Sequence, residues 1–217
     1  MNRRHLEEKR AVGYYEDKLA QHGSTAAGVD WGSEESQELR FEQLLRVVDP
    51  ARRDVKLNDF GCGYGALAVR ALQLPGVSSY VGFDLSEAMI EAARSSHAES
   101  HGAAFVNRLE DLGVADYTVA SGVFNVRQES SEEVWWGYVQ DLIADLARFS
   151  RHGFAFNVLT SFADEDRKVS RLFYADPSQV LRHCQETYSR WVTLLHDYGL
   201  YEFTVLVRAE SEGAWQI

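Results

Sequence analysis

Three glycines with the spacing G-x-G-x-G, at positions 61, 63 and 65, lie in the segment LNDFGCGYGALA at residues 57–68. Apolar residues precede the glycines, and apolar residues at helical spacing follow them as far as Pro75 and Gly76. Glycine suits a turn whose backbone approaches a ligand closely, and the N-terminus of the following helix offers unpaired N–H groups. We therefore predict a strand, turn and helix that together can hold a nucleotide-like ligand.

An acidic residue, Asp84, follows Gly65 by 19 residues and ends a second predicted strand at residues 79–83. A carboxylate at such a strand end can accept hydrogen bonds from both hydroxyls of a ribose. A nicotinamide-dinucleotide fingerprint would read G-x-G-x-x-G, whereas here G-x-G-x-G is preceded by Asp59. Because a carboxylate at that position repels a diphosphate and suits an ammonium and a sulfonium, the pattern favours S-adenosylmethionine over NAD.

Three segments, NDFGCGYG, FDLSEAMIEAAR and ADYTVASGVFN, resemble motifs of the class I S-adenosylmethionine-dependent methyltransferases, and the resemblance covers about residues 55–160. It implies S-adenosylmethionine as the cofactor and a Rossmann-like, three-layer α/β sandwich. The expected sheet has seven mostly parallel strands and a C-terminal antiparallel hairpin. Since 217 residues fit one such domain, we expect an N-terminal helical cap at residues 1–50 and the methyltransferase domain at residues 51–217.

The same resemblance implies which residues contact the cofactor. Asp59 and the loop glycines are expected to face its methionine part, Asp84 its ribose, and the residues after the third strand its adenine. At that last position Leu109 stands where the family often has an aspartate, and Glu110 follows it. The expected cofactor-binding residues are Asp59, Gly61, Cys62, Gly63, Gly65, Asp84, Leu85, Met89, Leu109, Glu110, Ser121 and Gly122. The alternative interpretation is a purely structural glycine turn, because such turns are common after strands and a glycine motif on its own is weak evidence for a ligand site.

Strands and helices alternate along the chain, which predicts a parallel sheet with helices on both faces. We expect helices at residues 3–20, after Ser33, at residues 132–149 and from Asp176 onward, because each has an apolar stripe or a capping residue. Further strands are predicted at residues 117–126 and 153–160, and a hairpin turning at Gly199. Residues 160–177 are polar and long enough to act as a lid over the site.

Ligands of open α/β sheets lie outside the carboxyl ends of the parallel strands, so the strand exits are where we expect the methyl acceptor. Aromatic residues of the N-terminal cap can close over the same place, although such residues more often serve packing. The predicted substrate-contacting residues are Tyr14, Tyr15, Trp31, Phe124, Asn125, Asn157 and Tyr174.

The candidate catalytic base is His196, because histidine is a common general base in enzymes and Asp197 lies beside it in the sequence. Adjacent residues of a strand point to opposite faces, which weakens that pairing, and the alternative is that His196 completes the edge of the sheet. A base is optional here, because a sulfonium is already a good leaving group and much of the rate can come from holding the reactants in line.

The composition restricts the partners. A net charge of −11 opposes binding to the phosphate backbone of nucleic acid, so we expect none. No apolar run has the length of a membrane span, and no metal-ligand spacing is present. Cys62 and Cys184 form no disulfide pattern, which favours a reducing cytoplasm. The oligomeric state is left open, since the helix with Trp135 and Trp136 suits a core or an interface.

These observations predict an enzyme that transfers a methyl group from S-adenosylmethionine to an oxygen or nitrogen of a small molecule. The segments GVDWGSEESQELRF and residues 172–208 resemble a subgroup of small bacterial methyltransferases, which implies a sugar or secondary-metabolite acceptor. The alternatives are a protein methyltransferase, a non-catalytic module that binds S-adenosylmethionine, and an NAD-dependent oxidoreductase.

Overall fold

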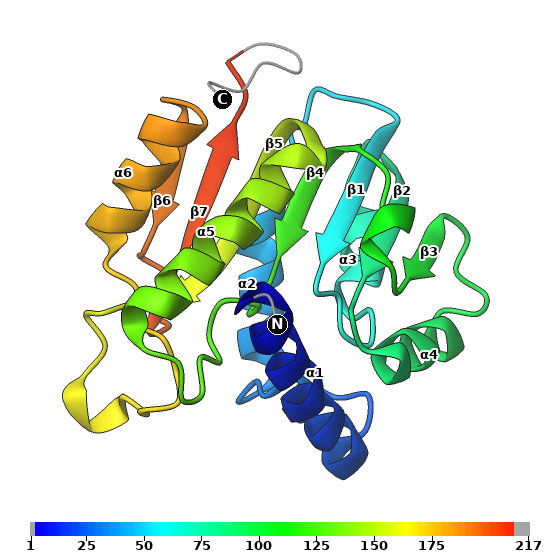
Figure 1. The fold of residues 1–217 in the computed structure, drawn as a ribbon. Helices are drawn as coiled ribbons and strands as arrows, with labels where there is room; N and C mark the ends of the chain where they lie inside the picture. Colours follow the sequence, from blue (N-terminus) through cyan, green and yellow to red (C-terminus); the bar gives the residue numbers. More distant parts are fainter. Residues whose placement is uncertain (1–2, 211–217) are drawn as a thin grey trace.

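The sheet of the computed structural model, which describes residues 3–210, has seven strands in the order β3-β2-β1-β4-β5-β7-β6 (Figure 1). The first five in that order are parallel, and β7 runs antiparallel to both β5 and β6. The strands are β1 (Val55–Phe60), β2 (Val77–Phe83), β3 (Ala103–Val106), β4 (Ala115–Ala120), β5 (Ser150–Leu159), β6 (Val192–Leu195) and β7 (Glu202–Arg208). The helices are α1 (Arg3–His22), α2 (Glu34–Leu45), α3 (Leu67–Gln73), α4 (Glu87–Ser96), α5 (Glu132–Arg148) and α6 (Pro177–Thr187).

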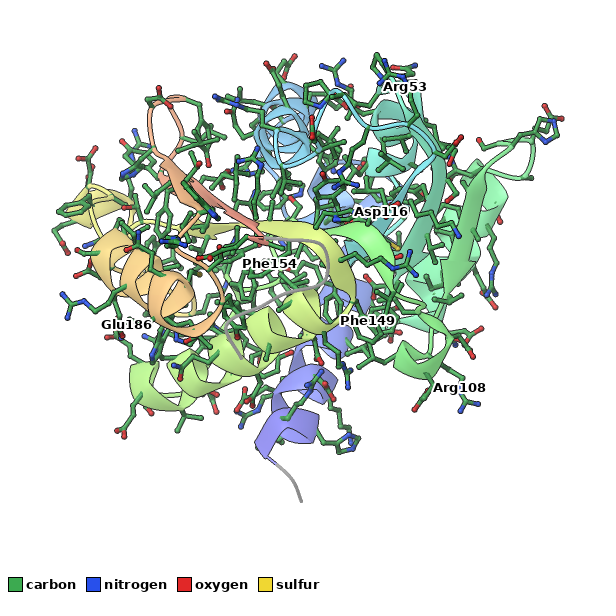
Figure 2. The ribbon with its side chains drawn as sticks, turned by 90° about the horizontal axis from the view of Figure 1, so that it is seen from above. Arg53, Arg108, Asp116, Phe149, Phe154 and Glu186 are labelled. Carbon is green, nitrogen blue, oxygen red and sulfur yellow. The ribbon has the colours of Figure 1, made fainter. Side chains whose placement is uncertain are left out.

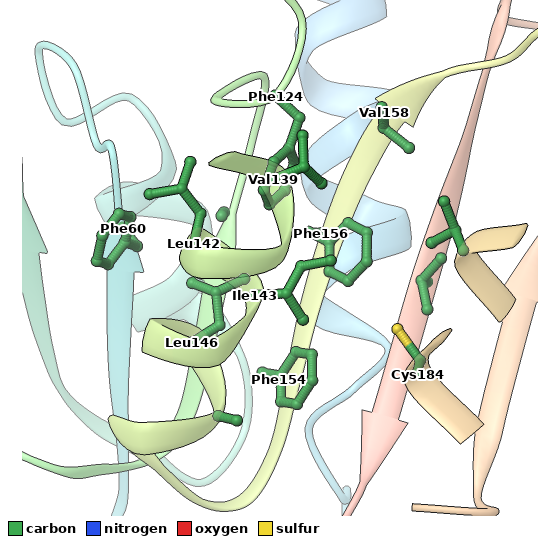
Figure 3. Packing of buried hydrophobic residues seen from close by; sticks show 14 of the residues in the cluster. Phe60, Phe124, Val139, Leu142, Ile143, Leu146, Phe154, Phe156, Val158 and Cys184 are labelled. Atoms are coloured by element: carbon green, nitrogen blue, oxygen red, sulfur yellow. The ribbon is translucent and has the colours of Figure 1, made fainter. Parts of the chain in front are cut away.

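Two clusters of buried apolar side chains lie between the sheet and its two helical layers. One joins α2, α3 and α4 to one face, and the other joins α5 and α6 to the opposite face (Figure 1). Figure 3 shows the second cluster, in which Leu142, Ile143 and Leu146 of α5 lie against Phe154 and Phe156 of β5. The predicted three-layer sandwich with a C-terminal antiparallel hairpin is therefore confirmed.

Charged side chains lie mostly at the surface, and apolar side chains lie mostly between the layers. Figure 2 shows Arg53, Arg108 and Glu186 at the periphery, while Phe149 and Phe154 lie inside. Trp135 is also buried, and its indole N–H donates to the carbonyl of Phe124 at 2.8 Å. Trp135 is thus a core residue, so its presence is no indication of an interface.

Three helices begin where the sequence predicts, and each has a capping residue at its N-terminus. The hydroxyl of Ser33 accepts the N–H of Ser36 at 3.1 Å, and the hydroxyl of Ser36 accepts the N–H of Ser33, which forms a capping box at α2. Asp176 caps α6 without such a box, because its carboxylate accepts the N–H groups of Ser178 and Gln179, with Pro177 in the first turn. Ser131 caps α5.

The fourth strand is shorter than the sequence predicts. It ends at Ala120 rather than at residue 126, because the chain turns out of the sheet at Gly122, whose φ is +76°. The N–H of Gly122 donates to the side-chain Oδ1 of Asn157 on β5 at 2.8 Å, and not to a backbone carbonyl of that strand. Only Val126 pairs again, in an isolated bridge with Leu172. This early exit shapes the site, since it opens the sheet at the carboxyl end of β4.

The helix α1 lies across the carboxyl ends of β1 and β4 rather than on either face of the sheet (Figure 1). It is two residues longer than predicted, and the loop that follows contains a short 3-10 helix at Ala27–Val29. Among the helices of residues 3–210, none combines the length and the apolar character that a membrane crossing demands.

Candidate functional site

A cavity of about 530 Å³ lies between α1 and the carboxyl ends of β1, β2 and β4. This volume falls within the roughly 300–1,000 Å³ range of small-molecule sites. The predicted site residues that line it are Tyr15, Trp31, Asp59, Gly61, Cys62, Gly63, Asp84, Leu85, Met89, Leu109, Glu110, Ser121 and Gly122. The strand–turn–helix motif and the two strand exits beside it therefore face one cavity.

The glycine loop is joined directly to the acid at the end of β2. The N–H of Gly63 donates to Oδ2 of Asp84 at 2.9 Å, and the N–H of Ser86 donates to Oδ1 at 2.9 Å. Gly63 has a φ of +53°, a conformation that suits glycine. Because a carboxylate oxygen has more than one acceptor position, both oxygens of Asp84 can still accept hydroxyls from the cavity. Burial raises the pKa of Asp84.

Asp59 lies beneath the loop and is only 3% exposed. The hydroxyl of Tyr80 donates to its Oδ2 at 2.6 Å. Burial raises the pKa of Asp59 to about 7; the hydrogen bond from Tyr80 opposes this shift, and the nearby charge of Asp84 adds to it. Asp59 forms no ion pair with any residue of the described range 3–210. A buried carboxyl in that state favours a ligand that carries a positive charge.

Residues after β2 and β3 form the end of the cavity beyond Asp84. Met89 is buried below it, Leu109 is partly buried, and Leu85 and Glu110 are exposed at the rim. Glu110 forms an ion pair with Arg108 at 3.4 Å. This combination of apolar surfaces with a polar rim suits a flat heteroaromatic ring.

The helix α1 supplies a complete wall of the cavity. Arg4, Glu8, Ala11, Val12 and Tyr15 line it at spacings of three and four residues, which places them on one helical face. The sequence interpretation included only Tyr15 of this set, although the spacing was visible in the sequence. Gln37, Tyr64, Asn107 and Tyr138 also line the cavity and were not predicted.

Polar contacts fasten α1 at both ends. Oγ of Ser130 lies 2.8 Å from both carboxylate oxygens of the buried Glu7, which share its single O–H donor. Near the other end, the hydroxyl of Ser86 donates to Oε1 of Glu16 at 2.9 Å. Tyr15 reaches the strand exit between them, where its hydroxyl lies 3.4 Å from the carbonyl oxygen of Gly122.

Trp31 forms the wall beside Gly122. A Cβ atom at position 122 would lie 2.5 Å from Cζ2 of the indole, so only glycine permits this approach. The guanidinium carbon of Arg40 lies 3.9 Å from the centroid of the Trp31 ring. The ring is therefore held between a cation and the backbone of the β4 exit.

The remaining predicted residues lie elsewhere. Gly65 packs under the ring of Phe105, outside the cavity wall. Phe124 is fully buried in the core, because the chain that leaves β4 folds back under α5. Asn125 and Asn157 are buried and occupied with backbone groups, since their Oδ1 atoms accept the N–H groups of Leu159 and Gly122.

The segment 160–177 does not cover the cavity, contrary to the expectation of a lid. It packs against the chain that leaves β4, where the N–H of Phe173 donates to the carbonyl of Asn125 at 2.8 Å. Tyr174 accordingly lies away from the cavity, and its hydroxyl accepts the N–H of Val169 at 2.9 Å. Tyr14 points away as well, because its hydroxyl donates to Asp30 at 2.5 Å.

His196 is exposed and lies outside the cavity, directly after β6. Its ring is near those of Phe162 and Phe203, with centroids 6.4 Å and 5.8 Å away. The hairpin carries the residue to the edge of the sheet, which agrees with the alternative interpretation and not with a base at this cavity. Among the described residues, no histidine lines the cavity.

Comparison with known proteins gives the family of the chain. A model described as a methyltransferase domain matches residues 58–153. A Mycobacterium tuberculosis protein with the name "Putative methyltransferase Rv1506c" is 42% identical over 170 residues, which are 78% of this chain and 99% of that protein. The chain belongs to the class I S-adenosylmethionine-dependent methyltransferases.

Solved structures of other methyltransferases share the fold. The N-methyltransferase NodS from Bradyrhizobium japonicum, in complex with S-adenosylhomocysteine, has a TM-score of 0.66 at 13% identity, and the match covers 93% of this chain and 99% of NodS. Magnesium protoporphyrin IX methyltransferase from Synechocystis has a TM-score of 0.65 at 13% identity, over 96% of this chain and 100% of that one. These structures share the fold, and membership of the methyltransferase family gives S-adenosylmethionine as the cofactor, as the sequence predicts.

Proposed function

We propose that the cavity under α1 binds S-adenosylmethionine and presents its methyl group to a small molecule. The observation that supports this most is that three residues face one cavity: Gly63 and Asp84, which are hydrogen-bonded to each other, and the buried carboxyl of Asp59. Asp59 forms no ion pair within the described part of the chain. Asp84 would hold the ribose hydroxyls, and Asp59 the ammonium end of the methionine part. Leu85, Met89 and Leu109 would enclose the adenine, with Glu110 at the rim.

When bound, the cofactor supplies an electrophilic methyl group on a sulfonium, which is a good leaving group. The residues of this chain then have to align the acceptor and exclude water. Tyr15, Trp31 and the exit at Ser121 and Gly122 surround the part of the cavity next to the expected methionine site. Since no histidine of the described residues reaches the cavity, positioning is the mechanism that we propose, on an oxygen or nitrogen acceptor.

A small acceptor, such as a sugar or a secondary-metabolite intermediate, fits the covered cavity better than a protein side chain. The helix α1 lies across the strand ends and contributes five of the lining residues, which supports assigning residues 1–50 as a cap on the domain at residues 51–217. The net charge of −11 supports an acceptor other than nucleic acid. Both cysteines are buried and unpaired, which supports a reducing cytoplasmic compartment.

Calorimetric titration with S-adenosylhomocysteine and, separately, with NAD tests the cofactor site. We expect saturable binding of S-adenosylhomocysteine and none of NAD, and binding of NAD alone would overturn the proposal. A screen of sugars, phenols, amines and peptides with a methyl-labelled donor then tests the acceptor class. Transfer to peptides alone would contradict a small-molecule acceptor, and tight donor binding without any transfer would indicate a binding module.

A further inference from the structure

A buried ion pair connects two elements that are far apart in the sequence. Nε of Arg40 on α2 lies 2.8 Å from Oε2 of Glu202, the first residue of β7. The two side chains are 9% and 1% exposed. Burying a charged pair costs desolvation energy that well-packed apolar side chains would avoid, so such a pair is weak evidence of a purely stabilising role. The other contacts of Arg40 and Glu202 show what else the pair can do.

Arg40 extends from the pair to the cavity wall. Its guanidinium lies over the indole of Trp31, 3.9 Å from the ring centroid, and its second nitrogen donates to the carbonyl of Ser36 at 2.8 Å. Two hydrogen bonds therefore restrict the guanidinium plane while it lies over the ring. Trp31 is the member of this contact that lines the cavity.

Glu202 reaches the same wall by another path. Its Oε1 accepts Nδ2 of Asn157 at 3.3 Å, and Oδ1 of Asn157 accepts the N–H of Gly122 at 2.8 Å. Gly122 is the residue against which the edge of the Trp31 ring lies. The two paths from the ion pair thus meet where Trp31 touches Gly122, and they form a closed ring of contacts.

We infer that Arg40 and Glu202 are positioning residues, which hold Trp31 and the Gly122 turn at the spacing that the methyl donor requires. Neither residue lines the cavity, so both act through others. The inference rests on the proposed placement of the donor in this cavity. Burial raises the pKa of Glu202, while Arg40 opposes that shift, so loss of Arg40 alone would leave an unpaired acid in the core.

The alternative is that the pair merely joins α2 to β7. That reading predicts lower stability without a specific effect on the cavity. The double variant R40M/E202M separates the two readings, because it replaces both charges with apolar side chains of similar length and leaves no buried charge unpaired. The exposed Arg46, just after α2, offers R46M as a matched control.

The readouts are the melting temperature, the affinity for S-adenosylhomocysteine and the acrylamide quenching of Trp31 fluorescence. The fluorescence of Trp31 is obtained by subtracting the signal of the corresponding W31F variant from that of each protein. For R40M/E202M we expect a folded protein, about tenfold weaker binding and stronger quenching of Trp31. In a W31A background the same double change should weaken binding by less than about twofold, since the residue through which Arg40 acts is absent. R46M should match the parent protein.

Two results would overturn the inference: unchanged affinity in R40M/E202M, or an equal loss of affinity with and without Trp31. If R40M/E202M does not fold, R40K serves in its place, because lysine keeps the charge opposite Glu202 and lacks the planar group that stacks on Trp31. Failure of the parent protein to bind S-adenosylhomocysteine would refute the proposed donor site instead, so the two failures are distinguishable.

Discussion

The backbone N–H of Gly63 donates to the carboxylate of Asp84 at 2.9 Å, so the glycine loop and the acid of β2 form one hydrogen-bonded unit. In D84N the amide NH₂ would replace one acceptor oxygen, which leaves either the N–H of Gly63 or that of Ser86 without its partner. We expect binding of S-adenosylhomocysteine to weaken by about 10- to 100-fold, because hydrogen bonds to a charged group contribute about 1.5–3 kcal/mol. Calorimetry measures the loss. The variant E91Q on the exposed side of α4 is the control, and equal affinities for D84N and E91Q would refute this role.

The pKa of Asp59, about 7 in the free protein against an ordinary value of 3.8, makes donor binding depend on pH. A cationic ammonium favours the ionised carboxylate, so binding should release a proton below pH 7. Affinity for S-adenosylhomocysteine should then rise between pH 5.5 and 8, approaching tenfold per pH unit below pH 7. Calorimetry in buffers of different ionisation enthalpy detects the proton. Binding enthalpies that are independent of the buffer at pH 6 would contradict the prediction.

The same pKa gives a prediction about stability. Because the folded-state pKa is raised, the protonated form contributes stability that is fully present below about pH 4 and is lost as the pH rises through 7. D59N should therefore melt at a higher temperature than the parent at pH 8, with a smaller difference at pH 5, while its donor affinity falls. Thermal denaturation at the two pH values measures this. The exposed variant D111N should show no such pattern.

The absence of a side chain at Gly122 allows the indole of Trp31 to lie against the backbone, and the substitution G122A should disrupt this contact. The added methyl group would lie 2.5 Å from the indole, at a backbone φ of +76°, so we expect a destabilisation of about 1–3 kcal/mol. Denaturant unfolding gives the value. In a W31A background the cost should fall to the backbone term of about 1 kcal/mol. Gly113, around which a Cβ would meet no atom within 4 Å, provides G113A as the control.

The buried carboxylate of Glu7 anchors α1 to Ser130. E7A should loosen the wall that α1 provides, and we expect the release of S-adenosylhomocysteine to become several-fold faster, with a destabilisation of about 1–3 kcal/mol. Stopped-flow displacement measures the release rate. D17A, at an exposed position of the same helix, controls for changes of helix charge. An unchanged release rate in E7A would show that α1 does not control escape of the ligand.

His196 was the base expected from the sequence, and its place outside the cavity predicts an inert substitution. H196A should keep the donor affinity and, once an acceptor is known, the turnover of the parent within about twofold. Removing a base normally costs about 10²–10⁴-fold in rate. A loss of that size in H196A would show that the hairpin reaches the reacting atoms.

The parts of the site that the sequence predicts are those with local signals. The glycine loop, Asp59 and Asp84 belong to one stretch of strand, turn, helix and strand, in which the spacing alone brings them together. Trp31 was expected near the substrate as part of an aromatic cap, and it lines the same cavity. The cavity-lining residues with local signals are therefore those that the sequence singles out.

The rest depends on contacts between distant segments. Phe124 follows β4 and Asn157 lies near the end of β5, where strand exits normally face the ligand. The early turn at Gly122 instead sends the chain back under α5, and the N–H of Gly122 occupies the side chain of Asn157. Arg40 and Glu202 are 162 residues apart, and neither belongs to a motif. Among the residues that the sequence interpretation did not include, those of α1 could have been predicted, because Glu8 and Val12 lie on the same helical face as Tyr15.

The position of β7 between β5 and β6 has a consequence for synthesis on the ribosome. Strands β1 to β5 can pair as they emerge, whereas β6 emerges before β7, the strand that it pairs with. The edge of β5 stays open until residues 202–208 have left the exit tunnel, and only then can Glu202 meet Asn157 and Arg40. A nascent chain that has not yet released β7 can thus hold a formed glycine loop, while the wall around Trp31 still lacks the contacts that Glu202 makes with Arg40 and Asn157.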